Sequence, residues 1–297
     1  MAHSLDLLNF PLLTDARSYL DNVRMQDWGG YIGMAILGYM QGIETVPQNM
    51  SEYVNFILYL ASIAFYLGFS FSVNNCFDYE GDKLGAKISL NPIAAGRISV
   101  NGGILFSSLL AAMGLAFTWC FFGPASFTIY AVMLALSGAY STPPLRLKSI
   151  PLIDMVSHGL FFGSLIVFYG VVVTGGFNVF TLPLLFSVYT LSLILELRNQ
   201  IDDIDEDSAT SVDTTVVRIG SERANTLFYG LIALHMGILA IIVSLLGNFA
   251  LTFSAVVFFV SVAFYFYRMP NRDKFLLIME RVTPAIYILF LLKLILF

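Results

Sequence analysis

Charged residues are scarce in this chain of 297 residues. Only 12% of the residues are Asp, Glu, Lys or Arg, whereas 58% are hydrophobic, and the mean hydropathy is +0.79. A water-soluble domain of this length could not hide so much apolar surface from solvent. The composition therefore excludes a soluble globular protein and predicts a polytopic membrane protein.

Cysteine is also rare, and no basic surface is evident. The two cysteines, Cys76 and Cys120, both fall within expected membrane helices, so we expect neither a disulfide nor a cysteine metal site. The net charge is −5, and the sequence has no nucleic-acid-binding pattern. We therefore expect the lipid bilayer, and no nucleic acid, as a partner.

The N-terminal segment, residues 1–26, lacks a basic start followed by an apolar core. A cleavable signal is therefore not expected. Its apolar residues Leu13, Ala16, Leu20 and Val23 recur at helical spacing. This pattern predicts a short interfacial helix on the cytoplasmic side of the membrane.

Long apolar runs follow this segment. Crossing about 30 Å of hydrocarbon takes roughly 17–25 helical residues. Nine such spans are expected, at residues 28–46, 52–79, 99–122, 124–141, 151–174, 177–201, 221–246, 248–268 and 275–297. The expected fold is all-α, with nine transmembrane helices in a single membrane domain over residues 1–297.

The basic residues give this topology an orientation. With nine spans, 14 of the 15 Lys and Arg residues lie on one side, at the N-terminus or at the connections near 80–98, 142–150, 202–220 and 269–274 with their flanking helix ends. The turns on the opposite side contain no Lys or Arg. The positive-inside rule predicts that the N-terminus and these connections are cytoplasmic.

One polar pattern occurs twice, 125 residues apart: Asn, three residues, Asp, three residues, Asp. Residues four apart on a helix differ by only about 40° in direction, so each triplet lies on one helix face. The first stripe is Asn74, Asp78 and Asp82, at the end of the second span, and the second stripe is Asn199, Asp203 and Asp207, at the end of the sixth. Few other carboxylates fall within the expected spans.

These stripes predict a metal site that opens to the cytoplasm. A charged Asp at the centre of a bilayer costs about 2.5–3.5 kcal/mol, so acidic residues at membrane-helix ends are functional candidates. The simpler interpretation, helix ends emerging into water, does not explain two triplets of identical spacing. Mg²⁺ prefers oxygen ligands and completes its shell with water and phosphate. Four carboxylates therefore suit about two or three Mg²⁺ ions that hold a diphosphate.

Cations for that diphosphate are available in neighbouring loops. One loop reads Tyr140-Ser-Thr-Pro-Pro-Leu-Arg146-Leu-Lys148, and another reads Asn91-Pro-Ile-Ala-Ala-Gly-Arg97. The candidate diphosphate-binding residues are Lys83, Arg97, Tyr140, Arg146 and Lys148. Topological anchoring or local charge balance is the alternative role of the basic residues among them.

These motifs together resemble the UbiA superfamily of intramembrane prenyltransferases. The resemblance covers nearly the whole chain and includes both stripes, NPIAAGRIS after the first, YSTPPLRLK after the fourth span, and the run from Asp207 through VDTTVVRIG. It implies a UbiA-like helical bundle with a cytoplasm-facing active site. It also implies Mg²⁺-dependent transfer of a prenyl group from an allylic prenyl diphosphate to a lipophilic acceptor. The implied catalytic and metal-binding residues are Asp78, Asp82, Asp203 and Asp207, with Asn74 and Asn199 in support.

Two departures from the family bear on the metals and on the acceptor. Asn75 stands where many members have Asp, so a carboxylate of the first stripe is missing or is replaced by Asp202. Arg24 lacks the basic residue and proline that often follow it in quinone-pathway members, although it remains a candidate for acceptor binding. The stretch YSTPPLRLKSIPLID resembles members that act on carotenoids, chlorophyllides or archaeal ether lipids. The acceptor is therefore an aromatic quinone precursor, an isoprenoid lipid or a pigment.

The histidines and the alternative functions complete the predictions. His158 lies four residues after Asp154 and is a candidate base toward the acceptor, with helix packing as its alternative role. His235 has no evident partner, and His3 lies in the N-terminal segment. Two other activities could use intramembrane carboxylates: a membrane terpene cyclase with the same metal site, and a secondary transporter.

Overall fold

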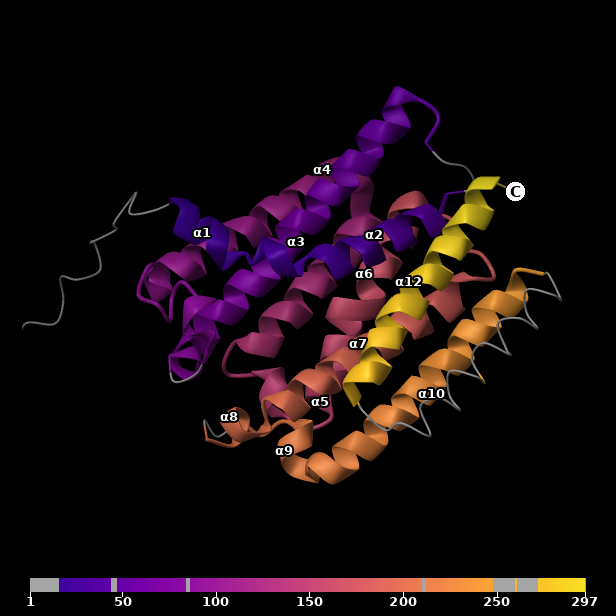
Figure 1. Cartoon of the computed structure of the whole chain (residues 1–297). Helices are drawn as coiled ribbons and strands as arrows, with labels where there is room; N and C mark the ends of the chain where they lie inside the picture. The colour runs from indigo at the N-terminus through magenta and orange to yellow at the C-terminus, as the bar shows by residue number, and fades with distance from the viewer. Residues whose placement is uncertain are drawn as a thin grey trace, which may run out of the picture.

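The computed structural model describes residues 16–43, 47–83, 86–209, 212–247, 260 and 272–296, and all regular secondary structure in these residues is helical (Figure 1). The elements are α1 (Ala16–Asn22), η2 (Met25–Asp27), α2 (Gly29–Gln41), α3 (Met50–Asp82), η3 (Ala86–Ser89), α4 (Val100–Ser141), η4 (Leu147–Ser149), α5 (Ile153–Gly159), the π-helix η5 (Leu160–Ser164), α6 (Leu165–Thr174), α7 (Thr181–Asp202), α8 (Ile204–Ala209), α9 (Thr215–Ile219), α10 (Ser221–Leu245) and α12 (Arg272–Leu296).

Five described helices are long and apolar enough to cross a membrane. They are α3, α4, the continuous run Ile153–Thr174, α7 and α10. The helix α2 has 13 residues and is shorter than the expected span 28–46, and the expected span 248–268 lies outside the described residues. The membrane-helix character is confirmed, whereas the number of nine crossings stays a prediction.

The element α4 folds back on itself at Gly123. This glycine has φ 77° and ψ −176° and is followed by Pro124. A Cβ atom placed on Gly114 would meet the Tyr130 hydroxyl at 2.1 Å, although a straight helix would separate these residues by about 24 Å. The two halves therefore lie antiparallel, with the turn where the sequence predicts one between residues 122 and 124.

The first stripe lies on a single uninterrupted helix. The 33 residues of α3 extend over about 50 Å at a rise of ~1.5 Å per residue. Its N-terminus is capped by the Asn49 side chain, which accepts from the backbone N–H of Glu52 at 3.1 Å. The helix continues through Asp82. The prediction that Asn74, Asp78 and Asp82 share one helix face is confirmed.

The second stripe differs, because the helix is interrupted at Asp203. The helix α7 ends at Asp202, Asp203 has φ −98° and ψ 6°, and the short helix α8 begins one residue later. Two backbone hydrogen bonds preserve the helical spacing across this break, from Asp203 to Asn199 and from Asp207 to Asp203, each at 2.9 Å. Asp203 and Asp207 thus keep the spacing of one helical turn, although Asp207 lies on a separate short helix.

Helix packing is tight at the centre of the bundle. The pairs α3 and α4, α2 and α6, and α7 and α10 lie side by side (Figure 1). A Cβ atom on Gly38 would lie 2.3 Å from the Val167 carbonyl oxygen, and one on Gly170 would lie 2.5 Å from the Tyr39 nitrogen. Only glycine permits this approach of α2 and α6. The backbones of α2 and α6 are therefore in direct contact at the centre of the bundle.

A buried amide network attaches the N-terminal helix to α3. Asn22 is fully buried and donates to the Ser72 hydroxyl at 2.6 Å. It also accepts from the Asn75 amide through its side-chain oxygen at 3.1 Å and through its backbone oxygen at 3.2 Å. Leu13 and His3 lie outside the described residues. The interfacial position of α1 stays a prediction.

Candidate active site

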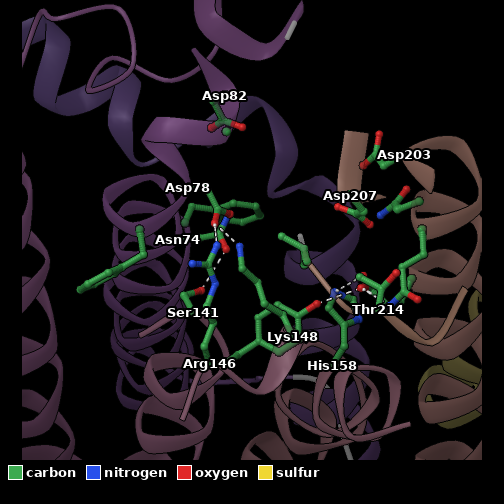
Figure 2. Close-up of a pocket in the computed structure, with 18 of the residues that line it drawn as sticks. Asn74, Asp78, Asp82, Ser141, Arg146, Lys148, His158, Asp203, Asp207 and Thr214 are labelled. Atoms are coloured by element: carbon green, nitrogen blue, oxygen red, sulfur yellow. Dashed lines mark hydrogen bonds and ion pairs between the residues drawn. The ribbon is translucent and has the colours of Figure 1, made fainter. Parts of the chain in front are cut away.

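A cavity of about 670 Å³ opens at the end of the bundle where α3, α4 and α7 terminate (Figure 2). Both stripes line it, the first from α3 and the second from α7 and α8. Figure 2 shows Asp78 on one side and Asp203 and Asp207 on the other. Two stripes 125 residues apart in the sequence therefore face each other across one cavity.

Asp78 receives two basic side chains from the loop after α4. The Lys148 ammonium forms an ion pair with its Oδ1 atom, and Arg146 Nη2 lies 3.6 Å from the same oxygen. One turn earlier on α3, Asn74 Oδ1 accepts from the Ser141 hydroxyl at 2.9 Å. The basic loop and the first stripe are thus joined, as the prediction for Arg146 and Lys148 requires.

Asp82 is held by Asn91, a residue that the sequence did not identify. The buried Asn91 amide donates to Asp82 Oδ2 at 2.8 Å and to the backbone oxygen of Asn75 at 3.0 Å. Asn75 itself is buried and bonded to Asn22. Asn75 therefore anchors the N-terminal helix and does not line the cavity.

The cavity carries a large excess of negative charge. Its basic lining residues are Arg24, Arg146 and Lys148, and its carboxylates are Asp27, Asp78, Glu80, Asp82, Glu196, Asp203, Glu206 and Asp207. Within the described part of the chain, no group of three or more His, Cys, Asp or Glu side chains is close enough to hold a metal ion by itself. Oxygen ligands with surplus negative charge, divided between two walls, suit a hard divalent cation that also binds a phosphate.

Lys83 and Arg97 lie outside the cavity lining, although the sequence made both candidates for diphosphate binding. Lys83 Nζ lies 4.8 Å from the centre of the Tyr79 ring, and Tyr79 donates to Glu80 at 3.1 Å. Arg97 Nη1 pairs with Asp21 Oδ2 at 2.6 Å on an exposed surface. The structure therefore brings only two of the four basic candidates, Arg146 and Lys148, to the stripes.

Tyr140 and His158 meet at a buried carboxylate, Glu196. The Tyr140 hydroxyl donates to Glu196 Oε1 at 2.8 Å, and His158 Nε2 lies 3.4 Å from Oε2. The other ring nitrogen of His158 lies 3.1 Å from the Ser192 hydroxyl. His158 thus has a packing partner, as its alternative role requires, and also lines the cavity as a candidate base.

Glu196 and Asp154 correct the expectation that the spans hold few other carboxylates. Glu196 is 8% exposed and Asp154 is fully buried, and the Gln200 amide donates to both, at 3.0 Å each. The sequence contains a signal that could have identified both carboxylates. Glu196 is one turn before Asn199 in an apolar helix, and Asp154 is one turn before His158. His235, expected to lack a partner, bonds Thr283 Oγ1 at 3.0 Å.

Arg24 lines the cavity but is already paired. Its Nε atom lies 2.8 Å from Asp27 Oδ2, and its guanidinium carbon lies 5.3 Å from the centre of the Phe71 ring. The Arg24 side chain is 29% exposed. An anionic acceptor at this position would compete with Asp27 for Arg24.

Aromatic rings from three elements line the cavity in contact with one another. Tyr31 of α2, Phe71 of α3 and Phe162 of η5 all line it. Their ring centres lie 4.6 Å apart for Tyr31 and Phe162, 5.4 Å for Phe71 and Phe162, and 5.8 Å for Tyr31 and Phe71. We call these three residues the aromatic floor. Behind it, α2 and α6 are in backbone contact.

Comparison with known proteins agrees with this architecture. The model of the UbiA prenyltransferase family matches residues 34–276. Lycopene elongase/hydratase of Halobacterium salinarum is 27% identical over 243 residues, 79% of this chain and 83% of that protein. Digeranylgeranylglyceryl phosphate synthase of Methanosarcina mazei is 29% identical over 180 residues, 60% and 58% of the two chains. A solved UbiA homolog from Archaeoglobus fulgidus superposes with a TM-score of 0.72 at 21% identity, covering 94% of this chain and 99% of that one. The chain therefore belongs to the UbiA prenyltransferase family and is an integral membrane protein.

Proposed function

We propose that this protein transfers a prenyl group from an allylic prenyl diphosphate to a lipophilic acceptor in the membrane, with Mg²⁺ as cofactor. The observation that carries this proposal is the pair of acidic stripes facing each other across one cavity, with Lys148 and Arg146 on Asp78. Family relatives support it. The homolog from Archaeoglobus fulgidus has been solved with GPP and Mg²⁺ and with DMAPP and Mg²⁺.

The metal ligands in this proposal are Asp78 and Asp82 on one wall and Asp203 and Asp207 on the other, with Asn74 and Asn199 beside them. Mg²⁺ is usually bound through one or two carboxylates plus substrate phosphates, not in an all-protein cage. The four carboxylates are divided between two walls and do not form a cage of protein ligands, which is consistent with this mode of binding. Bound Mg²⁺ supplies Lewis acidity and neutralises the charge of the diphosphate leaving group.

Lys148 and Arg146 bind the diphosphate. Both are held by Asp78 at the cavity, so they need only exchange one anionic partner for another when substrate arrives. Charge-assisted hydrogen bonds to phosphate oxygens are strong and become stronger as the leaving group gains charge. Lys83 and Arg97 keep their predicted role only if the substrate-bound form brings them inward.

The prenyl chain occupies the apolar half of the cavity and ends at the aromatic floor. Asp78 and Phe71 are seven residues apart on α3, about 10 Å along the helix axis. The closed bundle behind the rings keeps water away from the chain and from the allylic cation. This depth suits a short prenyl chain, and a longer one must displace the floor or pass between helices into the lipid.

The acceptor reacts beside Glu196 and His158. In the transfer, the bond between C1 and the diphosphate oxygen breaks and its electron pair leaves with the diphosphate. An electron pair of the acceptor forms the new bond to C1, and the acceptor then loses one proton. His158 Nε2 and Glu196 Oε2, 3.4 Å apart, are positioned to take that proton. Arg24 contributes to acceptor binding only if its pairing with Asp27 is broken.

Nine crossings with a cytoplasmic N-terminus and active site form part of the proposal. The partition of basic residues supports this orientation, and the cavity opens at the end of the bundle that carries the basic loop. We also propose that residues 1–297 form one domain.

The family assignment favours prenyl transfer over the transporter alternative. A terpene cyclase would use the same stripes without an acceptor. The deciding experiment incubates the purified protein in lipid nanodiscs with allylic diphosphates of different lengths and a host membrane lipid extract, in Mg²⁺ or EDTA. We expect a prenylated lipid by mass spectrometry in Mg²⁺ only. Diphosphate release without any prenylated acceptor would contradict transfer and support the cyclase.

A further inference from the structure

Asp154, the second residue of α5, is a fully buried carboxylate that the proposed chemistry does not use. Its Oδ1 atom accepts from the backbone N–H of Met155 at 2.7 Å and from the Thr215 hydroxyl. Its Oδ2 atom accepts from the backbone N–H of Thr215 at 2.6 Å and from the Gln200 amide at 3.0 Å. These four donors are neutral. Burial of a carboxylate is unfavourable unless hydrogen bonds compensate for lost water, so the arrangement points to a specific role.

The segment that Asp154 holds is the connection behind the second stripe. Two of its four hydrogen bonds come from Thr215, the first residue of α9. The preceding residue, Thr214, lines the cavity and caps α9. The following residue, Val216, donates its N–H to the Gln200 side-chain oxygen at 3.3 Å. Asp154 and Gln200 together therefore fix the start of α9 against α5 and α7.

The short helix α8, which carries Asp207, has no fully buried residue. Each of its six residues is half-buried or exposed. Its first turn is continuous with α7 through the hydrogen bond from Asp203 to Asn199. On its far side, Val212 donates to the Asp207 backbone oxygen at 3.0 Å, and three residues later the chain reaches Thr215, which is bonded to Asp154. The helix α8 is thus attached to the neighbouring structure at each end.

We infer that Asp154 is a positioning residue for the second acidic stripe. It acts through Thr215, which fixes the far end of α8 and so keeps Asp207 facing the first stripe. This inference rests on the proposed function, because it assigns Asp203 and Asp207 to metal and diphosphate binding.

The hydrogen-bond pattern explains why the residue is Asp and not Asn. Each carboxylate oxygen accepts two donors. An Asn in either orientation would place its NH₂ group against two of these donors, leaving buried polar groups unsatisfied. Asp154→Asn preserves shape and size, so its effect reports on the anchor and not on packing.

The test compares matched variants of the full-length protein in detergent or nanodiscs. Asp154→Asn disturbs the hydrogen bonds at both carboxylate oxygens. Thr215→Val removes the hydrogen bond from the Thr215 hydroxyl and keeps the one from its backbone N–H, whereas Thr215→Ser keeps both. Thr283→Val is the control, because it removes another buried hydroxyl, the partner of His235, on α12. Two quantities are measured: the Mg²⁺ concentration for half-maximal prenyl transfer, and the thermal stabilisation by Mg²⁺ with inorganic pyrophosphate.

Residues that orient metal ligands typically change metal affinity or activity about 10–100-fold when mutated. We therefore expect Asp154→Asn and Thr215→Val to raise the half-maximal Mg²⁺ concentration by about tenfold or more, and to lose most of the stabilisation by Mg²⁺ and pyrophosphate. Hydrogen exchange of peptides covering α8 should accelerate in both. Thr215→Ser and Thr283→Val should keep the wild-type Mg²⁺ dependence.

Wild-type Mg²⁺ dependence and wild-type α8 protection in Thr215→Val would overturn the inference, even if Asp154→Asn does not fold. If the proposed function is wrong, the result is different, because the wild-type protein then transfers no prenyl group. The variants can still be compared by their thermal stabilisation by Mg²⁺ and pyrophosphate.

Discussion

Lys148 forms an ion pair with Asp78, which joins the loop after α4 to the first acidic stripe across 70 residues of sequence. The two side chains are 13% and 19% exposed, so the pair lies partly shielded from solvent at the cavity. Because Arg146 approaches the same carboxylate, two cations are concentrated where the proposed diphosphate binds.

Lys148→Ala should raise the KM for the prenyl diphosphate. A hydrogen bond to a charged group contributes about 1.5–3 kcal/mol, which corresponds to roughly 10–100-fold in binding. Steady-state kinetics at saturating acceptor and Mg²⁺ measure the change, and Arg146→Ala should act in the same direction. Unchanged KM values in both variants would reduce the two residues to topological anchors.

Lys83→Ala and Arg97→Ala should change the same KM by less than about twofold. Arg97 is paired with Asp21 at the surface, and Lys83 lies over the Tyr79 ring. Exposed ion pairs contribute about 0–1 kcal/mol, so the loss of unfolding free energy should also stay below about 1 kcal/mol. A tenfold rise in KM for either variant would instead mean that substrate binding draws that residue into the cavity.

Phe162→Ala should increase the relative use of longer prenyl donors. The ring closes the floor against Tyr31 and Phe71, and its removal deepens the apolar half of the cavity. The measurement is kcat/KM for a series of allylic diphosphates of increasing length. Phe177→Ala, at a residue that is 61% exposed, is the control. An unchanged length preference in Phe162→Ala would show that the chain does not reach the floor.

A cysteine at Ser89 should be protected from an impermeant thiol reagent applied outside intact cells, while one at Gln48 should react. Both residues are exposed, and they flank opposite ends of the 33-residue helix α3. Cys120 is exposed and is first replaced by Ser, whereas Cys76 is buried. Labelling of Ser89→Cys and not of Gln48→Cys would reverse the proposed orientation and place the cavity outside the cytoplasm.

The sequence predicts best where chemistry repeats at helical spacing. Both stripes and the turn at Gly123 could be located, because Asn and Asp in an apolar chain and a Gly-Pro pair are strong local signals. The interruption at Asp203 could not, because a single residue leaving helical geometry changes neither hydrophobic periodicity nor composition.

Long-range hydrogen bonds were beyond the reach of sequence. The contact of Asn91 with Asp82 joins a loop to α3, and the contact of Asp154 with Thr215 joins α5 to α9. The partners in both contacts depend on tertiary packing. For the same reason Lys83 and Arg97, although near the first stripe in sequence, have side chains that turn away from it. Their positions in the expected loops and helix ends identified the basic candidates but could not rank them.

The Mg²⁺ dependence of stripe variants tests the central claim most directly. If Asp78 and Asp203 hold Mg²⁺ around one diphosphate, they act as a unit, and their losses are strongly non-additive. Asp78→Ala should abolish prenyl transfer nearly as completely as Asp78→Ala/Asp203→Ala, with both proteins monodisperse. Multiplicative losses from two independent sites, or full activity of the wild-type protein in EDTA, would contradict the shared diphosphate site.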